Sequence, residues 1–441
     1  MKATLKAVLA TSLLLAPAAF ATKVPIPIEG ATLNVSVQVQ TQALINENGA
    51  PNGNDPSYDI FVRRTRLLAN GDINQNFSYL LQVDNANFGK FGNFSTNVRA
   101  IIQDAWIGWA PTGITGGNVL YIDAGLLLIP ISHHLLESTT NFITADVHTD
   151  EFRFPGSGFP ALRETGVQLR GWWLDKKIGF RGGVYEGYTP AVQPAGTCTA
   201  TGVGCITPQR YPQFAGFVNF DVIGSEEGGW LYGAYKWAKD PVLSVGVSGV
   251  YQAKAIRNTG ISSTGDLANQ RLASADVYLN LPMSEAAELV VEAVGYLNGN
   301  GSGNTNTGKG FFVDAGYRFG FVAPYASFSY FQTDDCPTLT IPAQRTTCAQ
   351  SVDLGNSRNF KAGLNFFFNK NLNHLNLEFQ VNHGVSAYGP QSMTNAATNA
   401  GYFPALKYPN GTVVPTTPTD LRTSLRVAAQ KSFLVHWAVL F

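Results

Sequence analysis

Basic side chains recur at alternate positions in several segments of this 441-residue chain. Arginine stays charged at physiological pH and can bind oxyanions through paired N–H groups. Side chains alternate between the two faces of a strand, and this parity places a basic set on the polar face of the expected strands, together with an acidic set of similar size. The basic set is Arg64, Arg66, Arg170, Arg318, Lys361, Arg422 and Arg426. The acidic set is Asp84, Asp276, Asp314, Glu288, Glu292 and Glu378.

Two interpretations of these charges stay open. The basic residues are either solvated and salt-bridged side chains of an aqueous interior, or a guanidinium track that draws anions through it. The comparable number of acids weakens the second interpretation. Arg63 is out of parity and would face the opposite, apolar side, which suits an interface or a subunit contact.

A second group of polar residues lies in the long segment 130–162. A connection of this length is usually functional. It either folds into the aqueous interior as a constriction or covers the opening of that interior from outside. Because adjacent histidines point apart on a strand and no spacing here is diagnostic, we expect no metal. The segment contains His133, His134, Glu137, Asp146, His148, Asp150, Glu151 and Arg153.

The cysteines form two close pairs, Cys198 with Cys205 and Cys336 with Cys348, in polar segments. We expect disulfide-clipped loops made in an oxidising compartment, with free thiols as the alternative. There is no Cys-x-x-Cys or haem-attachment motif, so no cofactor is expected. G-x-S-x-G, P-loop and dinucleotide-binding motifs are absent, and His383 and His436 stand alone. The chain is therefore not expected to be an enzyme.

The elements that position these residues are strands of period two. The segment 32–44 alternates aliphatic with glutamine side chains, and Phe360–Val381 is a hairpin with one apolar face across a polar turn. The pattern predicts an all-β, transmembrane, antiparallel up-and-down β-barrel of about 16 strands, with short turns and long loops alternating. The predicted strands are 32–44, 57–69, 76–86, 98–110, 118–129, 163–173, 177–188, 211–223, 242–254, 269–281, 286–298, 308–320, 322–334, 357–369, 374–385 and 419–441.

One segment does not fit the count of 16 strands. Gly229–Trp237 could be a further strand, which would put the later long loops on the wrong side. We therefore treat 224–241 as a long excursion on the periplasmic side, with 18 strands as the alternative.

The two ends of the sequence predict an export route. Residues 1–21 have lysines, an apolar run and small residues, as a cleaved signal peptide has, leaving 22–441 as the barrel. From Leu421 to Phe441 the chain alternates apolar with polar side chains and ends on an aromatic residue. The whole chain has 30 basic and 30 acidic residues, which argues against a nucleic-acid partner.

Several motifs resemble the phosphate-selective porin O and P family. The motifs are Phe61–Leu67 with Gly71 and Phe77–Tyr79, Arg163–Gly171, Phe217–Asp221 through Gly229 and Leu243–Gly246, and Ala362–Asn369. The resemblance spans most of residues 32–441. It implies a trimeric sixteen-stranded barrel that passes small anionic solutes, with the third outer loop folded inward. Family members concentrate basic residues at the constriction, whereas 130–162 offers only Arg153. In this segment the chain departs from the pattern of the phosphate-selective members.

The expected function is that of an outer-membrane porin of a Gram-negative bacterium, passing small hydrophilic solutes or ions passively. Its expected partners are the lipid bilayer, lipopolysaccharide and two further copies of the chain. A phosphate- or oxyanion-selective porin is the second interpretation. A barrel sheath around a separate electron-transfer protein is the third. Replacing both Arg422 and Arg426 by alanine should lower any anion preference without unfolding the barrel.

Overall fold

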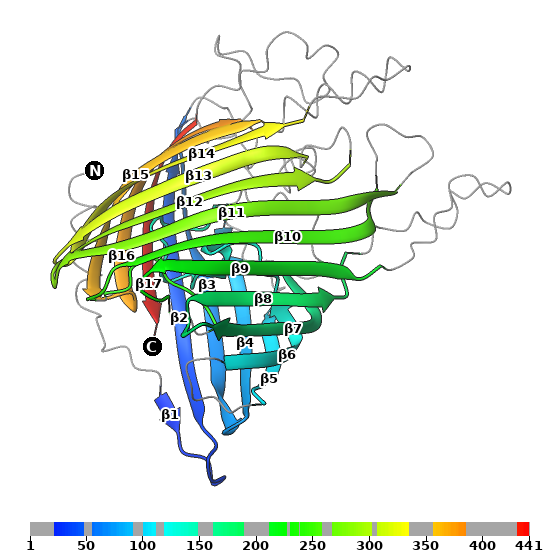
Figure 1. Cartoon of the computed structure of the whole chain (residues 1–441). Helices are drawn as coiled ribbons and strands as arrows, with labels where there is room; N and C mark the ends of the chain where they lie inside the picture. The colour runs from blue at the N-terminus through cyan, green and yellow to red at the C-terminus, as the bar shows by residue number, and fades with distance from the viewer. Residues whose placement is uncertain are drawn as a thin grey trace, which may run out of the picture.

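The computed structural model describes residues 22–47, 55–90, 100–111, 119–148, 162–188, 211–226, 230–237, 239–257, 267–301, 307–334, 356–384 and 430–440. These residues form one antiparallel sheet in which sixteen strands, β2 to β17, pair with their neighbours along the chain (Figure 1). The barrel strands are β2 (Leu33–Asn46), β3 (Ser57–Asn74), β4 (Phe77–Phe88), β5 (Ile101–Trp109), β6 (Val119–Leu128), β7 (Arg163–Trp173), β8 (Ile178–Tyr185), β9 (Gln213–Ile223), β10 (Val242–Arg257), β11 (Leu267–Ser284), β12 (Ala287–Gly299), β13 (Gly308–Phe319), β14 (Val322–Thr333), β15 (Ser357–Asn369), β16 (Asn373–Gly384) and β17 (Gln430–Leu440).

The sheet closes on itself because the last strand pairs with the first. β17 pairs with β2 from Ser432 opposite Asn46 to Leu440 opposite Gln38 (Figure 1). A short strand, β1 (Thr22–Val24), pairs with the start of β2, which β17 does not reach. Closure leaves the barrel no open sheet edge along these strands, as the interior of a bilayer requires. The predicted fold is confirmed: the chain has the architecture of a transmembrane β-barrel of sixteen strands.

Each predicted strand overlaps one observed strand. The described part of Gly229–Trp237 contains no barrel strand, so the alternative count of 18 is wrong. The described residues contain no helix that is long and apolar enough to cross a membrane.

The outer face of the barrel is apolar, as the hairpin of β15 and β16 illustrates. Phe360, Leu364 and Phe368 are 44%, 39% and 48% exposed. Phe360 lies opposite Val381 and Leu364 opposite Leu377, so the two strands present one continuous apolar stripe. Burying apolar surface yields roughly 25 cal/mol per Å². Contact of this apolar face with lipid is therefore favourable, whereas its exposure to water is unfavourable.

The connections differ in length between the two ends of the barrel. Residues 75–76, 174–177, 285–286, 320–321 and 370–372 join strands at one end, and 129–162, 186–212, 334–356 and 385–429 join them at the other. This is the asymmetry that the sequence predicts.

Two segments fold into the barrel and pack against inward side chains of the strands to form its core. The inner loop (residues 129–148) follows β6 and includes a single 3₁₀ turn, η2 (His134–Leu136). The inner turn (residues 230–237) lies between β9 and β10. The two run side by side through a parallel bridge between Glu137 and Tyr232. Most of their residues are buried. The expected excursion between β9 and β10 thus exists, but its described part enters the barrel.

Apolar packing explains why the inner turn enters the barrel. Trp230 packs at a tilt against Trp106 of β5 with ring centroids 4.5 Å apart, and Tyr235 packs edge-on against Phe367 of β15 at 5.1 Å. Gly233 allows the inner loop to approach, because a Cβ there would collide with the side chain of Asn141. Gly224, with φ +66°, supplies the left-handed residue from which the chain leaves β9.

Candidate pore interior

A basic wall lines the interior where β2, β3 and β4 meet. Arg64 and Arg66 both lie on the inner face of β3 and are each 6% exposed. Arg66 Nε lies 3.1 Å from Asp84 Oδ2 of β4. Arg64 Nη2 lies 2.7 Å from Asp146 Oδ1 of the inner loop. The β2 glutamines accept hydrogen bonds from both arginines, including one from Arg64 to Gln40 at 2.8 Å. These guanidinium groups are therefore neutralised by neighbouring acids.

Arg63 also points inward, so its expected outward position is wrong. Its Nε lies 2.6 Å from Asp146 Oδ2, and its side chain is 20% exposed. The cause is a β-bulge: the pairing of β3 with β2 steps from Arg64–Gln40 to Val62–Thr41 and leaves Arg63 without an opposite residue. An inserted residue breaks the alternation of side chains, which is why parity misplaced it.

A second basic region lies on β7 and β8. Arg170 Nε is 2.8 Å from Asp123 Oδ2 of β6, and its guanidinium lies 4.1 Å from the ring centre of Tyr121. Arg181 lies over Tyr232 of the inner turn, 5.2 Å from its ring centre. The aromatic faces and carboxylates hold these cations in fixed positions.

The opposite wall, formed by β11 to β16, carries buried acids. Glu288 pairs with Arg318, whose Nε lies 2.6 Å from Oε1. Glu378 accepts a hydrogen bond from the backbone N–H of Ala145 at 3.1 Å. The remaining three acids, Asp276, Glu292 and Asp314, are 5%, 1% and 0% exposed and contact histidines of the inner loop.

The inner loop thus contacts both walls with groups of complementary charge. Its acid, Asp146, contacts the basic wall, and its histidines contact the acidic wall. His133 Nδ1 lies 2.8 Å from Glu292 Oε1, and His148 Nε2 lies 2.9 Å from Asp314 Oδ1. Thr139 adds contacts to the β2 and β3 side chains, among them a 2.6 Å hydrogen bond from Arg66.

The protonation of the inner loop follows these contacts. Burial disfavours the Asp146 carboxylate, but the charges of Arg63 and Arg64 outweigh it and hold its pKa well below its usual range. Burial alone would lower the pKa of His133, but Glu226 and Glu292 raise it to about 10. Burial raises the pKa of Glu137 well above its usual value, and the nearby Glu292 and Glu226 add to the effect.

The structure brings most of the sequence-derived site residues together. Arg64, Arg66, Arg170, Arg318, Glu288, Glu292, Glu378, Asp84, Asp276 and Asp314 face the interior. So do His133, His134, Glu137 and Asp146, which lie in the inner loop. Lys361 is half-buried on β15, opposite Ser327 and Gln380. The remaining residues lie outside the described part of the chain: Asp150, Glu151, Arg153, Arg422, Arg426, Cys198, Cys205, Cys336 and Cys348.

Sequence reasoning did not identify several charged residues of this interior, among them Asp123 and Arg181 on the strands and a pair outside them, Glu226 and Lys236. Glu226 Oε1 lies 2.6 Å from His133 Nε2 and 2.7 Å from Lys236 Nζ. Both residues belong to the excursion between β9 and β10. The four aromatic residues of that segment, Trp230, Tyr232, Tyr235 and Trp237, indicate that it is too apolar for a solvated turn.

Comparisons with known proteins agree on the fold. No protein-family model matches the chain, and no curated protein matches its sequence. The structure is similar to Pseudomonas putida OprB at 8% identity and a TM-score of 0.54, over 93% of this chain and 94% of that one. It is also similar to an anion-selective porin from Comamonas acidovorans, at 12% identity and 0.51, over 93% and 100% of the two chains. A third similar structure is the outer-membrane channel DcaP of Acinetobacter baumannii, at 12% and 0.50, over 96% and 100%.

Proposed function

We propose that this chain is an outer-membrane porin of a Gram-negative bacterium, through which small hydrophilic solutes or ions diffuse passively. The observation that carries the proposal is the closed sixteen-strand barrel with an apolar outer face and a charged interior. A lipid-facing exterior and a polar lumen are the physical requirements of a diffusion channel in that membrane. The similar structures include proteins described as a porin and an outer-membrane channel.

The passage is narrow in this proposal. The inner loop and the inner turn occupy the barrel, and inward side chains such as Gln40, Asp123 and Glu378 are 0% exposed. We therefore propose that the inner loop forms the constriction and that only small solutes pass. An external cap, the alternative expected from the sequence, does not fit the contacts of residues 131–148 with β2, β3, β11, β12 and β13.

The interior supports weak ion selectivity better than a phosphate site. Arg64, Arg66 and Arg170 each contact an acid at 3.1 Å or less, so their charge is already compensated. A phosphate-binding track needs guanidinium groups that are available to the ligand. The phosphate-selective function of the resembling family therefore remains the second candidate, and conductance measurements can separate the two.

The other expectations fit the channel proposal to different degrees. A sheath requires a lumen open to a threaded partner, whereas here two segments of the chain itself occupy the interior.

We propose a homotrimer in contact with lipid and lipopolysaccharide, in keeping with the resemblance noted from the sequence. Chemical cross-linking in detergent tests the trimer, and the mass of the mature protein tests cleavage after Ala21. Reducing and non-reducing peptide maps test the two cysteine pairs.

Planar-bilayer conductance of the refolded protein in a chloride gradient tests the proposal. Small, ohmic channels with a reversal potential near zero, unaffected by added phosphate, are the expected result. Block by low phosphate with strong anion preference would instead establish the oxyanion-selective function. A folded barrel that conducts no ions under any applied voltage would refute the porin proposal.

A further inference from the structure

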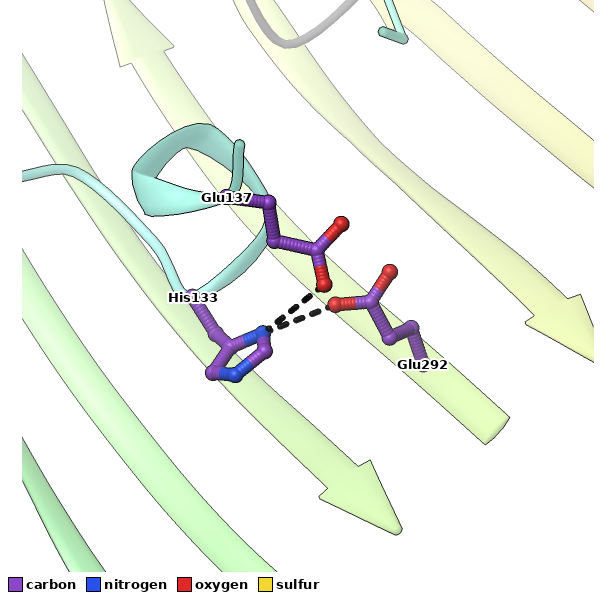
Figure 2. A group of neighbouring side chains, drawn as sticks. All are labelled: His133, Glu137 and Glu292. Carbon is purple, nitrogen blue, oxygen red and sulfur yellow. Dashed lines mark hydrogen bonds and ion pairs between the residues drawn. The ribbon is translucent and has the colours of Figure 1, made fainter. Parts of the chain in front are cut away.

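A histidine and two glutamates meet inside the barrel at the start of the inner loop. Figure 2 shows His133 and Glu137 from the inner loop converging on Glu292 of β12. His133 Nδ1 lies 2.8 Å from Glu292 Oε1 and 3.5 Å from Glu137 Oε1. The three side chains are 2%, 3% and 1% exposed. One ligand atom from each lies within 4.8 Å of the others.

These separations suit a shared metal ion. Two ligand atoms bound to one tetrahedral ion at about 2.1 Å stand roughly 3.4 Å apart. The His133 to Glu137 contact at 3.5 Å already has this spacing, and the His133 to Glu292 contact at 2.8 Å would lengthen by about half an ångström to close around an ion.

The carboxylate of Glu137 has no hydrogen-bond partner. Both of its oxygens are buried, and neither accepts a hydrogen bond. The neighbouring acids do have partners: Glu226 contacts Lys236 at 2.7 Å, and Glu292 contacts both His133 and His134. A buried carboxylate without a partner is unfavourable unless a proton or a cation neutralises it. Glu137 is therefore the residue of this group whose carboxylate accepts no hydrogen bond, although Nδ1 of His133 lies 3.5 Å from its Oε1.

The surroundings of His133 match those of a metal-bound histidine. Its Nε2 lies 2.6 Å from Glu226 Oε1, while its Nδ1 faces the two other glutamates. Metal-ligating histidines usually donate their second ring N–H to a carboxylate, which fixes the ring and raises its basicity. The rings of Tyr232 and Tyr278 stack on either side of His133, at 4.8 Å and 4.3 Å. The imidazole is thus held in one orientation before any ion binds.

We propose that His133 Nδ1, Glu137 and Glu292 bind a divalent transition-metal ion inside the barrel, with Glu226 as the residue that positions His133. One imidazole and two carboxylates favour Zn²⁺, Co²⁺, Mn²⁺ or Fe²⁺ over Ca²⁺ and Mg²⁺, which prefer oxygen ligands alone. The site was not expected from the sequence, because two of its ligands are local and the third is 155 residues later, on β12.

His134 has a different role in this site. The backbone N–H of His148 donates to His134 Nε2 at 3.2 Å, so Nε2 is the unprotonated nitrogen. Its Nδ1–H then donates to Glu292 Oε2 at 3.2 Å. His134 therefore orients the Glu292 carboxylate, leaving the other oxygen of that group for the ion.

Binding has a proton balance that can be measured. The ion replaces the proton on His133 Nδ1 and any proton on Glu137, both of which are released to solvent. The ion would join the inner loop to β12, and Glu226 would extend that connection to the inner turn. The site does not depend on the chain being a porin, because it concerns only how the inner segments are held.

Metal binding to the full chain tests the proposal. Protein without a polyhistidine tag is stripped with EDTA, refolded and dialysed against Zn²⁺ or Co²⁺ alone near neutral pH. We expect stoichiometric metal by elemental analysis, a Co²⁺ absorption spectrum, proton release and a higher melting temperature. Glu137→Gln and Glu292→Gln should abolish stoichiometric binding, and Glu226→Gln should lower the affinity about 10- to 100-fold.

Glu378→Gln is the matched control, since Glu378 is a buried interior carboxylate that contacts the inner loop but lies outside the site. It should bind the ion as the wild type does. Folding of each variant is checked by its shift on heating in gel electrophoresis. Absence of binding to the folded wild type overturns the proposal, and that result needs no variant. Binding that Glu137→Gln and Glu292→Gln both retain also overturns it.

Discussion

Asp146→Asn tests how the inner loop is held against the basic wall. The Asp146 carboxylate accepts two charge-assisted hydrogen bonds, at 2.6 Å from Arg63 and 2.7 Å from Arg64. An asparagine keeps the shape but removes the negative charge. Each hydrogen bond to a charged group contributes about 1.5–3 kcal/mol. The side chains of Asp146 and Arg63 are 22% and 20% exposed, so water screens part of this interaction.

We therefore expect the docked state of the inner loop to lose about 2–4 kcal/mol. That loss corresponds to a change of roughly 30- to 700-fold in the equilibrium between docked and undocked loop. The two released guanidinium groups also add uncompensated positive charge to the lumen. The variant should then prefer anions more strongly than the wild type and should open to larger or more variable conductance levels.

Single-channel recording in a salt gradient measures both effects. The reversal potential should move toward the equilibrium potential of chloride, and the apparent melting temperature in detergent should fall. Glu285→Gln is the matched control, because Glu285 and its partner Lys239 are 90% and 84% exposed at a turn. If Asp146→Asn has the reversal potential, conductance and melting temperature of the control, Asp146 does not hold the loop and this reasoning is refuted.

Three further predictions follow from the same interior. Arg318→Leu should lower stability by about 3–5 kcal/mol, because it leaves buried Glu288 without its cation; a denaturant midpoint equal to that of the wild type would contradict this. Gly224→Ala should destabilise the barrel by about 1–3 kcal/mol, since its left-handed backbone and the nearby Pro241 carbonyl exclude a Cβ, and Gly295→Ala, where a Cβ meets nothing, is the control. The pKa of Asp146 is lower in the folded protein than its usual value of 3.8. The contribution of Asp146 to stability is therefore complete above pH 3.8 and is lost only as the pH falls through the lower pKa of the folded state. Channel conductance recorded from pH 7 to pH 5 should therefore show no loosening from Asp146, and a transition there that Asp146→Asn abolishes would argue against it.

The strands could be predicted because their signal is local. In the hairpin Phe360–Val381, side chains two residues apart share a face, so each strand displays its lipid side in its own sequence. The register of that hairpin, with Phe360 opposite Val381, follows from its short turn. Parity also placed Arg64 and Arg66 on the inner face. It failed at Arg63, because a bulge adds a residue that no alternating pattern records.

The sequence by itself determined the sixteen strands, their inner and outer faces and many of the charges on the inner one. Only the tertiary structure decided which charges meet. Asp146 contacts Arg63 from 83 positions later, and His133 contacts Glu226 and Glu292 from 93 and 159 positions away. These contacts depend on two segments that enter the closed barrel and cross it. Alternation reports the environment of a residue along its own strand, whereas the path of a loop through a lumen depends on all the surfaces that it touches there.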